Sequence, residues 1–183
     1  MRKYQLLWVS KMIKQMITSV ALVAMFTGLT GCNAKETGVV NKNIGFTAPQ
    51  GWEYCGEYSS DDVAYYKNED GDIEITGWDY IEADGYTVTD ETAYDIACKM
   101  NTGYLEYTFG KECKALENEV RTSNGFIGAT SVVKTDKIKL TRTTVFSIAS
   151  KEMLNITMRT MLDTECIKCD TLNTLIESLK LKD

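Results

Sequence analysis

The chain has 183 residues, of which 44% are hydrophobic and 25% are charged, an ordinary balance for a globular protein of about one domain. It contains no histidine, so the commonest general base and metal ligand is missing, and Ser-His-Asp and Cys-His catalysis are excluded. The formal net charge of −6 repels phosphate backbones, which argues against a nucleic-acid partner.

The first 31 residues have the pattern of a secretory signal. A basic start is followed by an apolar run, Met16 to Phe26, that is too short to span a membrane comfortably. Next comes Leu29-Thr30-Gly31-Cys32. This segment resembles the lipobox of bacterial lipoproteins, with a branched residue, a tolerated variant, a small residue and the modified cysteine in that order.

The resemblance implies cleavage before Cys32 and a diacylglycerol on its sulfur. Two acyl chains, such as palmitate, give stable anchoring, so we expect an extracytoplasmic protein attached by lipid to a bacterial cell membrane. Removing residues 1–31, with four basic residues and no acid, leaves 152 residues with 16 basic and 26 acidic side chains, a net charge of −10. The envelope type stays open.

Residues 32–42 are mostly polar and predict a lipid-anchored tether, on the order of 20 Å long if flexible. Residues 43–183 then form a single domain. Its first expected strand contains Ile44, Phe46 and Ala48 and ends at Pro49-Gln50-Gly51-Trp52. A hairpin follows, with strands at 63–67 and 73–80. Asp70-Gly71 supplies the positive φ angles of its tight turn.

The rest of the domain alternates helices and strands. A helix capped by Thr89 or Asp90 runs to about Thr102, with Ala93, Ile96, Ala97 and Met100 on its apolar face. A poorly defined strand at 113–120 precedes a turn at 124–125. Three strands follow at 126–133, 139–148 and 153–161, with a tight connection at 151–152. A last helix runs from residue 163 or 164 to about 180, with Cys169, Leu172, Ile176 and Leu179 on its buried face and Leu175 beside it. This order predicts an α+β fold with an antiparallel sheet flanked by helices.

Two local patterns resemble the PsbP-like family. The first is Phe46-Thr47-Ala48-Pro49-Gln50-Gly51-Trp52, a strand that runs into Pro and Gly-Trp. The second is a late strand pair followed by a helix that closes in Ser178-Leu179-Lys180. The resemblance implies an α/β/α sandwich. It also implies a binding or assembly subunit, because the family has no shared catalytic residues.

The cysteines leave several alternatives open. If Cys32 carries lipid, five remain: Cys55, Cys98, Cys113, Cys166 and Cys169. Outside the cytoplasm cysteines tend to pair, but the sequence does not assign the pairs. Cys166-Ile167-Lys168-Cys169 at a helix start could lower a thiol pKa and support thiol–disulfide chemistry. A structural disulfide and two buried thiols are the alternatives.

Metal binding has little support in the sequence. The pair Cys166 and Cys169 lacks the second pair or histidines of a zinc site. The acids around Gly71 do not fill a calcium loop, since Tyr66 and Gly77 would fall on ligand positions. We therefore expect no metal and no cofactor.

Aromatic residues are concentrated in one third of the domain: Tyr54, Tyr58, Tyr65, Tyr66, Trp78, Tyr80 and Tyr86. Such residues can form a surface that binds a peptide or sugar, although many tyrosines in sheets are partly buried. The leading hypothesis is a non-catalytic binding or assembly lipoprotein with an unknown protein partner. The alternatives are a thiol–disulfide protein and a solute-binding accessory lipoprotein.

Overall fold

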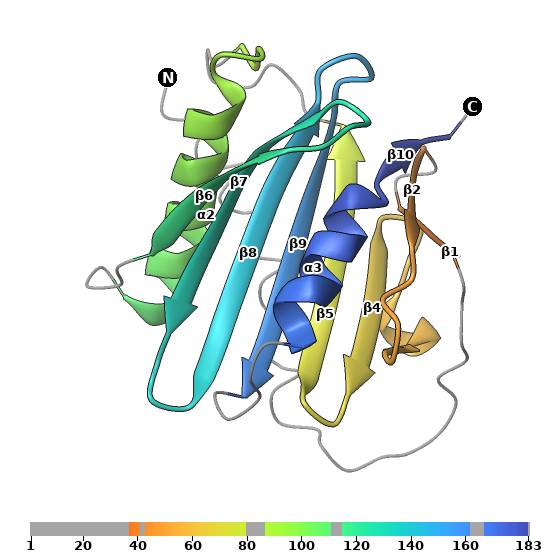
Figure 1. The fold of residues 1–183 in the computed structure, drawn as a ribbon, viewed down its shortest axis with the longest axis vertical. Coiled ribbons are helices and arrows are strands. Elements are labelled where there is room, and N and C mark those ends of the chain that lie inside the picture. The colour runs from red at the N-terminus through yellow and green to blue at the C-terminus, as the bar shows by residue number, and fades with distance from the viewer. Residues whose placement is uncertain (1–36, 41–42, 80–86, 111–114, 162–166, 183) are drawn as a thin grey trace, which may run out of the picture. The chain divides into compact units, whose positions relative to one another are not determined.

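The computed structural model describes residues 37–40, 43–79, 87–110, 115–161 and 167–182. The chain divides into two compact units, Met1–Gly31 and Cys32–Asp183, and every described residue belongs to the second. Its elements follow in the order β1 (Thr37–Val40), β2 (Ile44–Thr47), β3 (Glu53–Tyr54), η2 (Gly56–Tyr58), β4 (Val63–Asn68), β5 (Gly71–Asp79), α2 (Ala93–Phe109), β6 (Leu116–Arg121), β7 (Phe126–Lys134), β8 (Ile138–Ser147), β9 (Glu152–Met161), α3 (Ile167–Glu177) and β10 (Lys180–Leu181) (Figure 1).

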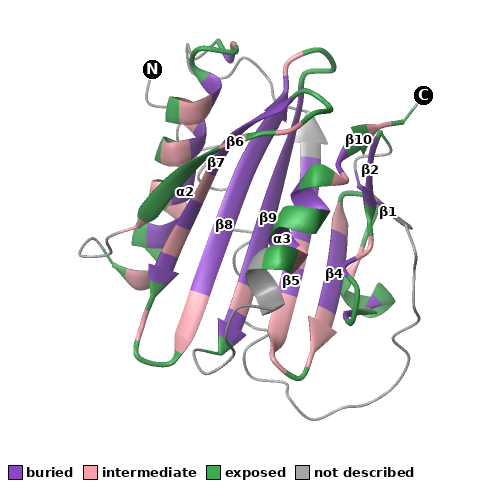
Figure 2. Cartoon of the chain, in the orientation of Figure 1, coloured by how far each residue is buried: buried purple, intermediate pink, exposed green. Residues whose placement is uncertain are grey.

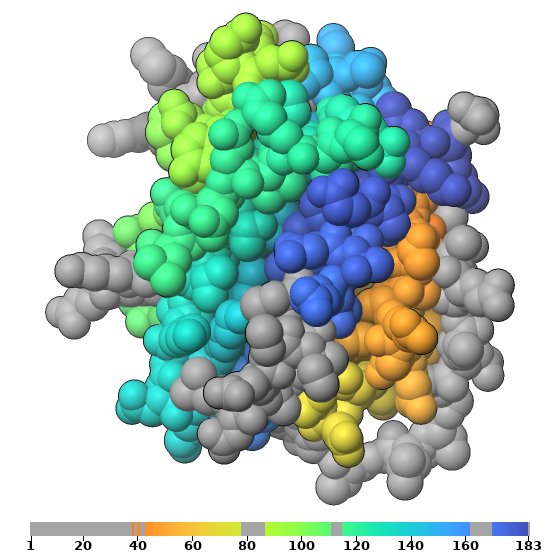
Figure 3. Space-filling model, viewed as in Figure 1, coloured from red at the N-terminus to blue at the C-terminus, as the bar shows by residue number. Residues whose placement is uncertain are grey.

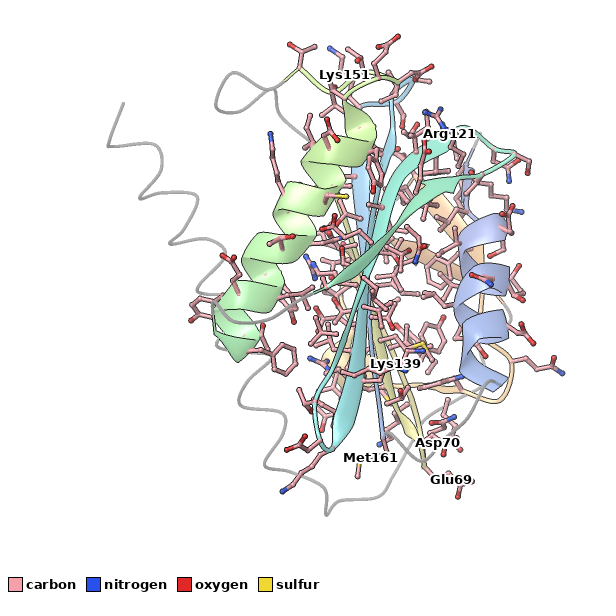
Figure 4. The ribbon with its side chains drawn as sticks, turned by 60° about the vertical axis from the view of Figure 1, so that its left-hand side comes forward. Glu69, Asp70, Arg121, Lys139, Lys151 and Met161 are labelled. Carbon is pink, nitrogen blue, oxygen red and sulfur yellow. The ribbon has the colours of Figure 1, made fainter. Side chains whose placement is uncertain are left out.

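Two antiparallel sheets make up the strand framework. The larger has seven strands in the order β3-β4-β5-β9-β8-β7-β6, and the smaller has three in the order β1-β2-β10. Helix α2 lies on one face of the large sheet and α3 on the other, which Figure 4 shows with the sheet nearly edge-on. The fold is therefore α+β, an antiparallel sheet between helices, as the order of elements predicted.

The core has two sides because both faces of the large sheet are covered. Strands β8 and β9 are buried along most of their length (Figure 2). On the α3 side, Leu172, Leu175 and Ile176 pack with Phe46 of the small sheet and with Ile75 of β5. On the α2 side, smaller clusters join Ala93, Ala97 and Leu105 of the helix to β7 and β8.

The predicted hairpin at β4 and β5 is confirmed, but the reason given for its glycine was wrong. Gly71 does not have a positive φ; the described glycines that do are Gly51, Gly110 and Gly125. A Cβ at Gly71 would lie 1.9 Å from the carbonyl oxygen of Arg159 on the neighbouring strand. Glycine is required there by the close approach of two backbones, which the local sequence does not reveal.

Both helices have different ends from those predicted. Helix α2 begins at Ala93 and continues to Phe109, well beyond Thr102. Its buried stripe continues through Asn101 to Leu105. Because Asn101 is polar, the apolar spacing in the sequence stops before the helix does. Helix α3 ends at Glu177, because the last residues leave the helix to form β10 beside β2.

Part of the stretch expected to be a tether is a strand. Thr37–Val40 forms β1, which pairs with β2, and Val40 is fully buried. Gly38 lies directly under the ring of Phe46. The short strands β1, β3 and β10 were not predicted, since two to four residues do not establish a period.

Candidate binding surface

A layer of buried polar groups joins α2 to the large sheet. Asn101 is fully buried; its Nδ2 donates to the carbonyl oxygen of Ala129 at 3.0 Å, and its Oδ1 accepts from Thr144 Oγ1 at 2.7 Å. Thr144 Oγ1 also lies 2.5 Å from an amide oxygen of Asn155, whose Nδ2 has no partner. One hydroxyl proton cannot serve two acceptors, so the Asn155 amide is better turned with Nδ2 donating to Thr144.

A charged cluster lies farther along the same face of the sheet. Arg159 of β9 pairs with Asp72 of β5, with 2.6 Å between Nε and Oδ1, and its Nη2 lies 3.6 Å from Glu74 Oε2. Burial acts to lower the pKa of Arg159, but the two carboxylates outweigh burial and raise it. Burial raises the pKa of Asp72, and Arg159 opposes that rise. Both pKa values are raised, which favours the charged form of Arg159 but the neutral form of Asp72. The short Nε–Oδ1 distance favours an ionised pair.

Arg142 of β8 is buried beside this cluster. Its Nη1 donates to Thr157 Oγ1 at 2.7 Å, and its guanidinium carbon lies 4.0 Å from the ring centroid of Tyr104 on α2. Burial lowers the pKa of Arg142, while Tyr104 and Glu74 act to raise it. These contacts tie α2 to the centre of the sheet by a cation–π interaction. Their burial suits a structural role.

An open groove lies on the outer side of α2, next to strand β6. It encloses about 450 Å³ and is lined by Tyr94, Asp95, Cys98, Lys99, Thr102, Gly103, Glu106 and Glu117. Thr102 Oγ1 donates to Glu117 Oε1 at 3.1 Å and joins the helix to the strand. A wide, solvent-exposed groove of this kind suits contact with a protein or peptide better than enclosure of a small molecule.

The chemistry of the groove is not that of an activated nucleophile. Burial raises the pKa of the Cys98 thiol, and the charge of Glu117 and a hydrogen bond to it act in the same direction, whereas a hydrogen bond with Tyr94 opposes them. The thiol is therefore protonated at neutral pH, which disfavours attack on a disulfide. Among the described residues, no group of three or more Cys, Asp or Glu side chains could hold a metal ion.

The predicted aromatic surface is only partly exposed. Tyr65 and Tyr66 alternate on β4 and are both buried, on opposite faces of the sheet, and burial raises the pKa of each hydroxyl. Tyr54 packs edge-on against Tyr66, and Tyr58, 37% exposed, packs against Tyr65. The Trp78 side chain, Tyr80 and Tyr86 lie outside the described residues, so a binding role for this region stays a prediction.

The other predicted site residues are also untested. Leu29, Thr30, Gly31, Cys32, Cys113 and Cys166 lie outside the described residues, and so does the side chain of Cys169. Cys55 is a buried thiol whose Sγ lies 3.6 Å from the carbonyl oxygen of Glu53. Cys98 is a thiol in the groove.

The sequence did contain a signal for the groove that was not recognised. Asp95, Cys98, Lys99, Thr102 and Glu106 are spaced so that they share one face of a helix. A polar face normally indicates contact with solvent alone. The neighbouring edge strand, which turns this face into one wall of a groove, is a product of the tertiary fold.

In the part of the chain that the structure describes, no helix is both long enough and apolar enough to span a membrane. Neither a protein-family model nor a curated protein matches the chain.

Among solved structures, the chain is similar to cyanobacterial PsbP (CyanoP) from Synechocystis sp. PCC 6803, with a TM-score of 0.56 and 12% identity over 86% of this chain and 99% of that one. A structure from Bacteroides thetaiotaomicron VPI-5482 matches with a TM-score of 0.44 and 9% identity over 81% of this chain and 48% of that one. The likeness to CyanoP shows a PsbP-like fold.

Proposed function

We propose that this chain is an extracytoplasmic lipoprotein, anchored by lipid on Cys32, whose domain is a non-catalytic binding or assembly module. The observation that carries the binding role is the open groove between α2 and β6, which is accessible along the helix and lined mostly by polar and charged residues. The PsbP-like fold supports the same role, since the family resemblance implies a binding or assembly subunit. The lipobox pattern supports the anchor.

The strand β1 bears on where such a module would stand. Because β1 begins at Thr37, four residues separate it from the lipid-carrying cysteine. The five steps from Cys32 to Thr37 span at most about 18 Å when the backbone is fully extended. The lipidated domain would therefore stand close to the membrane and meet partners at or near its surface.

The anchor is tested with the full chain expressed in a bacterium that processes lipoproteins. We expect labelled palmitate to be incorporated into the native chain and not into the Cys32→Ser variant. A Thr30→Ala variant, which keeps the leucine, glycine and cysteine of the lipobox, serves as the matched control and should be labelled normally. Equal labelling of Cys32→Ser would refute the anchor.

The binding role is tested by photo-crosslinking in living cells. A photoreactive residue at Glu106, an exposed position in the groove, is compared with one at Glu177, an exposed position on α3 across the sheet. We expect one reproducible protein adduct from position 106 and none from position 177. The absence of any specific adduct at the groove would count against a binding module that uses this surface.

A further inference from the structure

Strand β6 ends the large sheet, so one side of its backbone faces away from β7. The hairpin between them fixes which groups face outward. The Thr122 N–H donates to the Phe126 carbonyl at 2.9 Å, and the Gly125 N–H donates to the Thr122 carbonyl at 3.2 Å. Hydrogen-bonded and non-hydrogen-bonded pairs alternate along an antiparallel ladder. Since Thr122 is hydrogen-bonded across the hairpin, residues 120 and 118, counted back along β6, are hydrogen-bonded to β7.

The outward-facing residues of β6 are therefore Glu117, Glu119 and Arg121. Each presents its N–H and carbonyl away from β7, and no described strand pairs with them. All three residues are exposed, and the neighbouring Leu116 is 71% exposed. In Figure 1 this strand lies along the margin of the sheet, on the side where α2 lies. Such a row of backbone donors and acceptors can receive a further strand.

The groove is continuous with this edge. Glu117, Glu119 and Arg121 are the register partners of Ser131, Ala129 and Ile127, and the last two pack in the cluster beneath α2. Side chains at these positions of β6 therefore lie on the α2 side of the sheet. A strand added to β6 would place alternate side chains on that same side, beside the groove.

The charges at this edge indicate which kind of segment would bind there. Asp95, Glu106 and Glu117 line the groove, against a single base, Lys99. On the strand, Glu119 pairs with Arg121 in an exposed contact of 2.6 Å. In Figure 4, Arg121 lies near the top of the sheet, far from Lys139 and Met161 near the bottom.

We propose that β6 is the docking edge for an extended, basic segment of a partner protein, which adds to the large sheet as an eighth strand. Backbone hydrogen bonds to residues 117, 119 and 121 hold the segment, and its lysines or arginines face the acids of the groove. This inference rests on the proposed binding function and names the surface and the chemistry of its partner.

The test uses the purified full chain in detergent and two fluorescent decapeptides, one alternating lysine with threonine and the other alternating glutamate with threonine. The decisive variants are Glu119→Ala and Glu119→Pro. Both remove the same charge, but only proline removes the outward N–H. Proline is tolerated at such an edge position, because that N–H makes no bond to β7.

We expect the basic peptide to bind the native chain and the acidic peptide not to bind. Glu119→Pro should bind about tenfold more weakly than Glu119→Ala, with circular dichroism unchanged. Independently of any variant, the basic peptide should slow amide hydrogen exchange at residues 117, 119 and 121 of the native chain and leave exchange in β4 unchanged.

Equal binding by the two Glu119 variants, or unchanged exchange at the three outward amides, would overturn the inference. If the proline variant does not fold, the exchange measurement on the native chain decides. A specific adduct at Glu106 in cells together with no protection of β6 would leave the proposed function standing and refute the edge. If no specific adduct forms at Glu106 and β6 is not protected from exchange, the proposed function is refuted as well.

Discussion

At the scale of single residues, Arg159 illustrates how a charge is held inside this sheet. Its guanidinium lies between Asp72 and Glu74, and its side chain is 19% exposed. The two carboxylates come from the adjacent strand, 87 positions earlier in the chain for Asp72. Loss of the arginine would leave two half-buried acids close together with no cation between them.

We therefore expect Arg159→Met to lower the free energy of unfolding by about 3 kcal/mol, because the acids keep their desolvation cost and lose their partner. The matched control is Arg121→Met. Arg121 makes an equally short contact with Glu119, but both side chains are about half exposed, so the loss should be below about 0.5 kcal/mol. Urea denaturation measures both variants. Similar losses in the two would contradict this account of burial.

Cys98 gives a second prediction at this scale. Since burial and Glu117 raise its pKa, Cys98 should react with iodoacetamide at pH 8 more slowly than free cysteine does. Glu117→Gln removes the charge, lowers the pKa and should speed alkylation. Glu119→Gln, two residues along β6, should leave the rate unchanged. Peptide mass spectrometry follows Cys98 alone, and an unchanged rate in Glu117→Gln would contradict the assigned cause.

At the scale of elements, the attachment of α2 depends on polar contacts as much as on apolar ones. The fully buried residues of this helix are Ala93, Ala97, Asn101 and Leu105, and its larger apolar side chains, such as Ile96 and Met100, are only partly buried against the core. Asn101 completes the attachment by bonding to both β7 and β8. Tyr104 adds its contact with Arg142 one turn later.

Asn101→Leu should destabilise the protein by about 2 kcal/mol, although leucine is a better helix former and is apolar. The reason is that the Ala129 carbonyl loses its side-chain donor and Thr144 loses one of its two amide neighbours in a buried layer. Thermal or urea unfolding measures the change. The control Thr108→Leu alters an exposed position of the same helix and should change stability by less than about 0.5 kcal/mol. Stabilisation by Asn101→Leu would refute the role of the polar layer.

At the scale of the whole molecule, the two ends of the domain close on each other. Strand β2 lies between β1 and β10, so residues 37–40, 44–47 and 180–181 share one sheet. The Lys182 N–H donates to the Asn43 carbonyl at 2.6 Å, and the Thr47 N–H donates to Ser178 Oγ at 2.9 Å. In Figure 3 this region (orange and dark blue) forms one continuous surface beside α3.

Removal of residues 180–183 should therefore lower stability by about 2 kcal/mol and increase hydrogen exchange in β2, because the pairing of Lys180 and Leu181 with β2 is lost. Lys180→Ala keeps the backbone pairing and serves as the control, with a change below about 0.5 kcal/mol. The outcome that would contradict closure is a truncated chain with native stability and unchanged exchange in β2.

The sequence by itself determined the elements whose signals are local. The strands β7, β8 and β9 were predicted to within about a residue or two, because alternation of side chains and glycine or lysine at the turns act over a few positions. The helices were located by their apolar spacing, and the α+β class followed from the order of elements. The acidic charge is also a property of the chain alone, and the export signal stays a prediction from the sequence.

Tertiary structure decided what depends on partners far away in the sequence. Asn101 is buried because β7 and β8 satisfy its amide, and Gly71 is needed because Arg159 approaches it from the far end of the chain. Strands β1 and β10 exist because β2 pairs with both. The groove and its open edge arise where α2 crosses the last strand of the sheet. Register and buried polar pairing are set by contacts between segments, so no local pattern could have specified them.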